Sequence, residues 1–249
     1  MKAIILGIVQ GITEFLPISS SGHLVLLQSL MNVESPGVIL EVTLHFGTLL
    51  SIIIFFRKRI VNYLTIKKLT LIIVGTIPIG IIGFLLKKQI ESLFSEPLVV
   101  CVMLSITGVV LFLTRTRLKV KRELNLKTVF IIGVAQAIAL IPGISRSGLT
   151  VSTALLIGIS REQSFEFSFM LAIPALLGAF ILEFPDITKS SVNYFQIISG
   201  AITALLFGLF ALWVFYKSIK KQRLHYFSYY LWFVSVSGLL LFLTSRSLL

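Results

Sequence analysis

The sequence predicts an all-α polytopic membrane protein with an inverted-topology repeat, composed of six full spans and two re-entrant helix-loop-helix pairs. Hydrophobic residues make up 56% of the 249 residues and charged residues only 13%, whereas a soluble domain is about 25% charged. Several apolar runs approach or exceed the roughly 20 residues that a transmembrane helix needs. A polar stretch near the start of the chain also recurs in its second half.

The two polar stretches, residues 7–22 and 133–148, repeat each other at a constant offset. Glycine, glutamine, isoleucine and serine positions coincide in the two copies. The first copy contains Glu14 and is followed by His23, whereas the second contains Arg146. Because ionisable groups are costly at membrane depth, they mark a functional site by default. We therefore expect the chemistry of the protein at these two stretches.

The first stretch predicts a re-entrant hairpin. Residues 1–16 form an apolar run too short to span a bilayer, and a second short run follows over residues 24–30. The hydroxyl-rich segment Ser19–Ser21, named the first tip, separates them. Such irregular backbone is tolerated at membrane depth where protein buries it or where it lines a cavity.

The second half repeats this arrangement. Short apolar runs at residues 128–141 and 148–159 flank the segment Ser145–Ser147, named the second tip. The alternative, in which the half-length helices are ordinary tilted spans, stays open because apolar runs alone do not separate the two arrangements.

Six longer apolar runs are expected to cross the membrane completely. They lie at residues 38–56, 69–86, 98–114, 163–184, 194–216 and 226–244. Residues 32–37 are predicted to form a turn and residues 87–97 a loop. The chain is then a single membrane domain, 1–249, with one repeat over about residues 1–114 and the other over about 127–249.

Basic residues cluster in three of the predicted loops, at residues 57–68, 115–127 and 217–223. The positive-inside rule places these loops in the cytoplasm. Each half has an odd number of full spans, so the first hairpin enters from outside and the second from inside, with the tips meeting near the midplane. The net charge of +12 is then explained by contact with anionic lipid rather than with nucleic acid.

The two tips predict an anion site. Each return arm begins as a helix N-terminus, where free N–H groups and the positive end of the helix dipole favour anions. Arg146 adds a planar guanidinium that suits phosphate oxygens, and the tip serines add hydroxyl donors. The pattern predicts a phosphate or pyrophosphate cradle within the bilayer. A structural role for Arg146, as a partner for Glu14 or for helix carbonyls, is the alternative.

Gln10 and Glu14 share a helix face because they are four residues apart. Their oxygens suit a hard divalent cation such as Mg²⁺ or Ca²⁺ beside a phosphate. Alternatively, Glu14 orients His23 or shuttles its proton. His23 could attack phosphorus, act as general base to a serine, or protonate the leaving group. Glu41 and His45, also four apart, are either a supporting pair or a simple interhelical contact.

The motifs Gln10-x-x-x-Glu14 with Ser-Ser-Ser-Gly-His23, and Pro142-Gly-Ile-Ser-Arg146-Ser-Gly-Leu-Thr150, resemble those of the bacterial undecaprenyl-diphosphate phosphatase family of the bacitracin-resistance type. The resemblance covers essentially the whole chain, and the motifs are specific in combination. It implies a multi-pass enzyme of the bacterial plasma membrane that hydrolyses undecaprenyl diphosphate to the monophosphate and inorganic phosphate. This reaction recycles the lipid carrier for cell-wall synthesis, with help from a divalent cation.

The resemblance implies catalytic roles for Glu14, Ser20, His23 and Arg146, with a serine, the histidine or an activated water as the nucleophile. The predicted substrate-binding residues are Gln10, Ser19, Ser21, Gly143, Ser145, Ser147 and Thr150. Many members of the family carry Glu at the position of Gln10, so the missing charge leaves its role as a metal ligand open.

A lipid transporter is the main alternative, because inverted repeats with broken helices are typical of secondary transporters. A flippase for polyprenyl phosphate would need the Arg146 cradle but neither a nucleophile nor a proton donor. A lipid-binding scaffold is a third alternative. The expected partners are a polyprenyl diphosphate and membrane lipids, without nucleic acid, and the sequence is compatible with a monomer or a homodimer.

Overall fold

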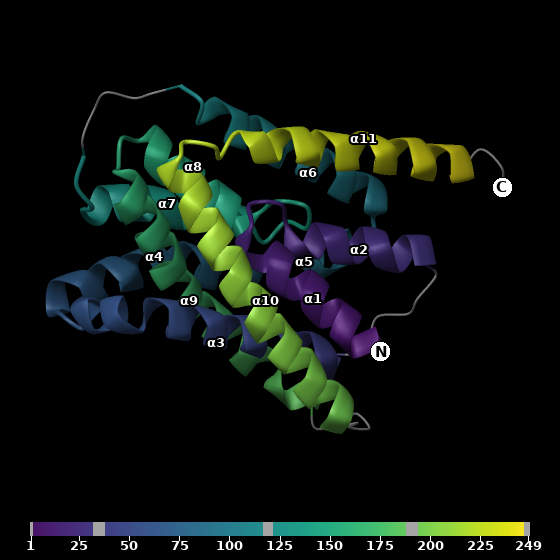
Figure 1. Cartoon of the computed structure of the whole chain (residues 1–249), viewed down its shortest axis with the longest axis horizontal. Coiled ribbons are helices and arrows are strands. Elements are labelled where there is room, and N and C mark those ends of the chain that lie inside the picture. The colour runs from purple at the N-terminus through teal and green to yellow at the C-terminus, as the bar shows by residue number, and fades with distance from the viewer. Residues whose placement is uncertain (1, 32–37, 117–121, 188–193, 247–249) are drawn as a thin grey trace.

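A computed structural model describes residues 2–31, 38–116, 122–187 and 194–246, and this part of the chain is all-helical apart from one isolated bridge. Figure 1 shows the arrangement. The helices are α1 (Lys2–Phe15), α2 (Ser20–Met31), α3 (Val38–Tyr63), α4 (Ile66–Leu85), α5 (Lys87–Leu93), α6 (Pro97–Leu113), α7 (Leu126–Ile138), α8 (Arg146–Leu156), α9 (Arg161–Ile187), α10 (Tyr194–Lys220) and α11 (Tyr226–Arg246).

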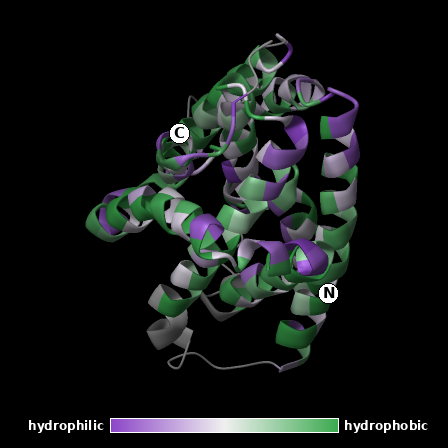
Figure 2. Cartoon of the chain, turned by 90° about the vertical axis from the view of Figure 1, so that its left-hand side faces the viewer, coloured by the Kyte–Doolittle hydropathy of each residue, from purple (hydrophilic) through white to green (hydrophobic). Residues whose placement is uncertain are grey.

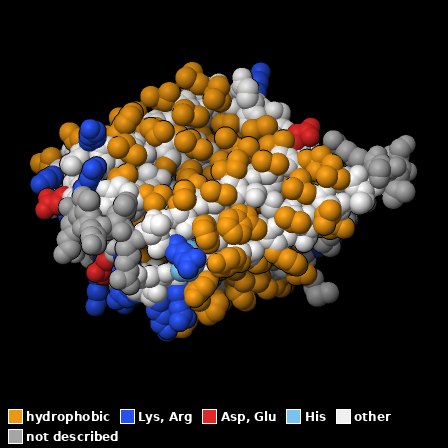
Figure 3. All heavy atoms as spheres, turned by 90° about the horizontal axis from the view of Figure 1, so that it is seen from above, with side chains coloured by type: hydrophobic (Ala, Val, Ile, Leu, Met, Phe, Trp, Pro, Cys, Tyr) orange, Lys and Arg blue, Asp and Glu red, His pale blue; other side chains and the backbone are white. Residues whose placement is uncertain are grey.

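Within the described residues, four helices are long and apolar enough to cross a membrane, namely α4, α9, α10 and α11. The bent pair of α5 and α6 raises this number to five. The flanks of these helices expose large apolar side chains such as Ile73, Ile181 and Phe233. Apolar residues run along most of the ribbon in Figure 2, and apolar side chains cover much of the face seen in Figure 3. A soluble monomer rarely exposes so much contiguous apolar surface. The predicted class of all-α membrane protein is confirmed.

The element boundaries agree with the sequence-based prediction to within a few residues in most places. The prediction of a loop at residues 87–97 is wrong, because this segment contains the short helix α5 and α6 already begins at Pro97. Proline is well tolerated there because the first helical N–H groups have no partner within the helix. The two helices are bent by 96° relative to each other. The turn predicted at residues 32–37 lies outside the described residues.

Helices from the two halves pack against each other in exchanged pairs. α1 lies along α10, and α7 lies along α4. Both contacts depend on glycine, because a Cβ atom on Gly7 would clash with the carbonyl oxygen of Gly200, and one on Gly133 would clash with that of Gly75. Gly7 and Gly133 occupy equivalent positions in the repeated stretches. The two halves therefore meet through matching positions.

The basic connections lie at one end of the molecule. The α3–α4 and α10–α11 connections and the start of α7 lie on the left in Figure 1, and most of the Lys and Arg side chains seen in Figure 3 gather there. Arg59 in the last turns of α3 forms ion pairs with Glu162 and Glu166 of α9. α1 begins and α11 ends at the opposite end. A single basic end is what the positive-inside rule requires.

A cluster of phenylalanines forms the part of the core that supports the first tip. Phe15 at the end of α1 packs edge-on against Phe169 of α9, with ring centroids 5.6 Å apart. Phe169 also contacts Phe56 of α3 and Phe215 of α10. All four side chains are buried. Because Phe15 directly follows Glu14, this packing fixes the end of α1 and the position of that carboxylate.

Candidate functional site

The two tips fold as matched helix N-termini. The Oγ atom of Ser19 accepts a hydrogen bond from the backbone N–H of Gly22 at 3.2 Å, and that of Ser145 accepts one from Gly148 at 3.1 Å. In each tip the serine two residues later lies 3.3 Å from the capping hydroxyl. A capping serine satisfies one of the free N–H groups of the first turn. The helices α2 and α8 therefore begin within the tips, so the tip residues are held by helical backbone.

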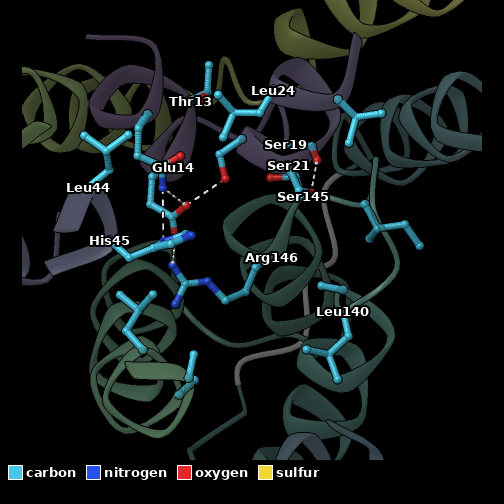
Figure 4. Close-up of a pocket in the computed structure, with 18 of the residues that line it drawn as sticks. Thr13, Glu14, Ser19, Ser21, Leu24, Leu44, His45, Leu140, Ser145 and Arg146 are labelled. Atoms are coloured by element: carbon cyan, nitrogen blue, oxygen red, sulfur yellow. Dashed lines mark hydrogen bonds and ion pairs between the residues drawn. The ribbon is translucent and has the colours of Figure 1, made fainter. Parts of the chain in front are cut away.

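Glu14 lies at the centre of a polar group that joins the two tips, as Figure 4 shows. Its carboxylate accepts hydrogen bonds from Ser20 Oγ at 2.7 Å and from Gln10 Nε2 at 3.0 Å. It also forms an ion pair with Arg146, whose Nη2 atom lies 2.6 Å from Glu14 Oε1. A buried ion pair requires such additional donors because both charges are removed from water. The structure thus brings together four of the predicted site residues, namely Gln10, Glu14 and Ser20 from the first repeated stretch and Arg146 from the second.

This polar group opens onto a cavity of about 260 Å³. The predicted residues Gln10, Glu14, Ser19, Ser20, Ser21, Ser145 and Arg146 all line it. Apolar side chains from several helices and from the turn after α7 form the walls, among them Leu24, Leu44 and Leu140 in Figure 4. A pocket with apolar walls and a few convergent polar groups is typical of a ligand site. Its division into a polar and an apolar part suits an amphiphilic ligand.

Several buried polar atoms at this cavity have no hydrogen-bond partner within the described residues. They are Gln10 Oε1, Arg146 Nη1 and both amide atoms of Gln136, a cavity-lining residue of α7. Buried polar atoms are normally paired, and leaving one unpaired costs about 1–3 kcal/mol. Their concentration at one cavity indicates that a ligand or water completes them.

His45 of α3 extends the polar group. Its Nδ1 atom lies 3.1 Å from Gln10 Nε2, and Figure 4 shows the ring beside Glu14 and Arg146. Because Gln10 Nε2 also contacts the Glu14 carboxylate, Nε2 is the donor to both neighbours and His45 Nδ1 is the acceptor. The Gln10 oxygen is then left without a partner. The contact predicted between His45 and Glu41 involves a side chain outside those described.

His23 lies apart from the cavity. Its Nε2 atom is 2.7 Å from the hydroxyl of Tyr230 on α11, and its Nδ1 atom is 2.8 Å from the carbonyl oxygen of Ser19. The His23 and Tyr230 rings stack with an interplanar angle of 3°. Because the carbonyl can only accept, Nδ1 carries the proton of the neutral ring and Nε2 accepts from the tyrosine. His23 therefore joins the first tip to α11 in this structure, and the structure does not bring it to Glu14 or Arg146.

Gly143, Ser147 and Thr150 lie behind the cavity wall and hold the second tip. Gly143 adopts φ +93° and packs closely on the α6 backbone, a combination that glycine accommodates best. Ser147 Oγ donates to the Leu16 carbonyl at 3.3 Å, and Thr150 Oγ1 donates to the Arg146 carbonyl at 2.7 Å. None of the three is among the residues that line the cavity.

Gln136 and His45 line the cavity but received no defined role from the sequence. Gln136 matches Gln10 in the repeat, and this correspondence could have identified it. The sequence indicates His45 only together with Glu41 on the same helix. Its contact with Gln10 joins two different helices, so the spacing along the sequence does not indicate it. Glu14 is the one carboxylate among the described residues that line the cavity, and no cluster of three His, Cys, Asp or Glu side chains suited to a metal occurs among the described residues.

Comparison with known proteins gives one consistent result. The family model described as bacitracin resistance protein BacA matches residues 3–237. A relative from Halothermothrix orenii, named undecaprenyl-diphosphatase, is 41% identical over 251 residues and covers 96% of this chain and 97% of its own. A protein of the same name from Carboxydothermus hydrogenoformans is 40% identical over 254 residues, with 96% of each chain covered. One from Methanosphaera stadtmanae is 38% identical over 269 residues, with 97% of each chain covered.

Proposed function

The chain belongs to the bacitracin resistance protein BacA family, and we infer that it is an undecaprenyl-diphosphatase. It hydrolyses undecaprenyl diphosphate to undecaprenyl phosphate and inorganic phosphate, and so returns the lipid carrier to cell-wall synthesis. It is a multi-pass protein of the bacterial plasma membrane. The observation that carries this conclusion is the cavity at which Glu14, Ser20 and Arg146 meet, in a chain about 40% identical to proteins of that name. The alternative of a flippase has no support in the comparisons.

The substrate has a charged head and a long apolar tail, and the cavity has a matching division. The diphosphate would lie against the N-termini of α2 and α8 and accept hydrogen bonds from Arg146, whose Nη1 atom is free. The first isoprene units would pack on the apolar walls formed by residues such as Leu24 and Leu140. The remainder of the tail would extend into the surrounding lipid.

Ser20 is the nucleophile that the contacts favour. Its hydroxyl donates to the Glu14 carboxylate at 2.7 Å, which is the arrangement of a nucleophile with its general base. As Ser20 Oγ attacks the terminal phosphorus, its proton passes to Glu14, the bond to the bridging oxygen breaks, and undecaprenyl phosphate leaves with that proton. Water then attacks the phosphoserine and gives a proton to Glu14, which returns it to Ser20 Oγ as the phosphoserine bond breaks and phosphate is released. Arg146 would stabilise the charge that develops on the phosphoryl oxygens.

The oxygen atoms at the cavity could act as ligands of a divalent cation. The Glu14 carboxylate and the unpaired Gln10 Oε1 form a small set of hard ligands, and Mg²⁺ typically uses one or two carboxylates together with water and substrate phosphates. A bound cation would neutralise charge on the diphosphate. Gln10 and Glu14 are the residues that would hold it.

The finer architecture belongs to the same proposal. The helices α3, α4, α6, α9, α10 and α11 would be six full spans, because they have 17–27 residues. The pairs α1–α2 and α7–α8 have arms of 11–14 residues, or roughly 17–21 Å, which is too short for a hydrocarbon core of about 30 Å. The exchanged helix pairs and the single basic end support an inverted repeat with the tips near the midplane.

The function is tested by phosphate release from purified protein in detergent, with undecaprenyl diphosphate or a shorter polyprenyl diphosphate. We expect release by the wild type, strong reduction by EDTA, and loss in Arg146→Ala. Thermal unfolding of each preparation shows that the protein is folded. Folded wild type that releases no phosphate with Mg²⁺ or Ca²⁺ would overturn the enzyme assignment.

A further inference from the structure

We propose that Gln136 is a second phosphate-binding residue, by which the second repeat holds the diphosphate opposite Gln10 and Glu14. This inference rests on the proposed function, because the ligand is the head group of that substrate. The side chain of Gln136 is fully buried, lines the cavity, and has no partner for either amide atom among the described residues.

The repeat explains why this amide is free. Gln10 and Gln136 occupy equivalent positions, but Gln10 donates to Glu14 four residues later, and the residue equivalent to Glu14 in the second copy is Leu140. Leucine offers no acceptor, so the Gln136 amide remains available although its surroundings are just as enclosed. The two copies therefore differ in one respect: Gln10 is hydrogen-bonded to a carboxylate, whereas Gln136 lines the cavity without a partner among the described residues.

The unpaired atoms of Gln136 are unusual within this protein. Among the described residues that do not line the cavity, only Ser152 of α8 has a buried side-chain polar atom without a partner. Such atoms are rare because burial removes their hydrogen bonds to water. At the cavity they occur together, with donors at Arg146 Nη1 and Gln136 Nε2 and acceptors at the two glutamine oxygens. A ligand that supplies both acceptors and donors satisfies them.

A diphosphate has this chemistry. Its non-bridging oxygens accept from Gln136 Nε2 and from Arg146 Nη1, and a protonated phosphate oxygen or a bound water donates to Gln136 Oε1. A neutral amide also avoids adding a second positive charge beside Arg146. The substrate diphosphate and free pyrophosphate share this chemistry, so the experiment uses both.

The test compares Gln136→Met with Ser152→Ala, since each removes a buried unpaired polar atom and only Gln136 lines the cavity. Both variants should unfold at or above the wild-type temperature when no ligand is present, because an unsatisfied group is lost. The KM for polyprenyl diphosphate should rise about tenfold or more in Gln136→Met, as expected for a lost hydrogen bond to a charged group. It should be unchanged in Ser152→Ala.

Inorganic pyrophosphate provides a readout that needs no turnover. It should raise the unfolding temperature of the wild type and of Ser152→Ala, and much less that of Gln136→Met. Gln136→Glu, which keeps the shape but opposes phosphate with a carboxylate, should lose this shift completely and provides the test if Gln136→Met does not fold. An unchanged KM and an unchanged pyrophosphate shift in the Gln136 variants would overturn the inference. Absence of phosphate release by the wild type would instead refute the proposed function, while the pyrophosphate shift would still decide whether Gln136 binds phosphate.

Discussion

Glu14 and Arg146 are 132 residues apart in the sequence, and their ion pair at 2.6 Å joins α1 to the second tip. The side chains are only 7% and 16% exposed, respectively. The ion pair holds the carboxylate and the guanidinium in place beside the cavity. In the proposed reaction, an entering diphosphate would compete with Glu14 for Arg146, and a released carboxylate oxygen would become available as a base or as a cation ligand.

Removing one partner of this pair should affect stability as well as activity. Arg146→Gln or Glu14→Gln alone leaves a buried charge without compensation, at a cost of about 3–5 kcal/mol. The double variant removes both charges and should unfold at a higher temperature than either single variant. Thermal unfolding in detergent measures this coupling. Additive losses in the double variant would show that the two charges do not interact in solution.

Arg146→Lys should abolish most of the activity although it keeps the positive charge. An ammonium cannot contact Glu14 and also present a second, geometrically fixed donor to phosphate, as the guanidinium can. We expect kcat/KM to fall by about 100-fold or more, the effect of losing a charged donor that acts on the transition state. Steady-state phosphate release measures the change. Near-normal activity in Arg146→Lys would mean that only the charge of residue 146 matters.

His45 should act through Gln10, as an acceptor that holds the amide in one orientation. His45→Gln supplies another acceptor and should retain kcat/KM to within about threefold, whereas His45→Leu should lower it about threefold to tenfold, the effect of one neutral hydrogen bond. If His45 acts only through this amide, His45→Leu should have no further effect in a Gln10→Ala background. A large additional loss in that background would show a direct role for the imidazole.

Removing the His23–Tyr230 hydrogen bond tests whether His23 has a structural role or takes part in the reaction. Tyr230→Phe removes the hydroxyl that contacts His23 Nε2 but retains the stacked ring. We expect a loss of stability of about 1 kcal/mol and little change in kcat or in its pH profile, because the pair lies outside the cavity. A tenfold change in kcat or a shifted pH profile would show that His23 takes part in the reaction.

The sequence was sufficient to predict the class of fold and most of the polar residues at the cavity, because polar and ionisable side chains in apolar sequence are conspicuous. It was not sufficient to distinguish Ser20, which faces the cavity, from His23, which faces α11. A shift of one or two residues in the start of α2 would change the direction of both side chains, and the sequence does not fix that start so closely. His45 contacts Gln10 from a different helix, and the spacing of residues along the sequence does not predict such a contact. The helix at Lys87–Leu93 was missed because its lysines and glutamine suit a polar loop equally well.

Substituting Gln10 tests the proposed cation site. Gln10→Glu adds a second carboxylate beside Glu14, so the Mg²⁺ concentration for half-maximal activity should fall severalfold. Mg²⁺ should also raise the unfolding temperature more in Gln10→Glu than in the wild type, a measurement that requires no substrate. Equal responses of the two proteins to Mg²⁺, by both measurements, would exclude residue 10 as a ligand.

The glycine contact between α4 and α7 should be essential for stability, and α4 itself provides the control. A Cβ on Gly133 would clash with the backbone of Gly75, whereas a Cβ on Gly80 has nothing within 4 Å. Gly133→Ala should therefore destabilise the protein by about 1–3 kcal/mol through overpacking, and Gly80→Ala should be neutral or slightly stabilising, since alanine favours the helix. Because α7 leads directly into the second tip, Gly133→Ala should also reduce phosphate release. Equal unfolding temperatures for the two variants would show that α4 and α7 do not approach each other this closely.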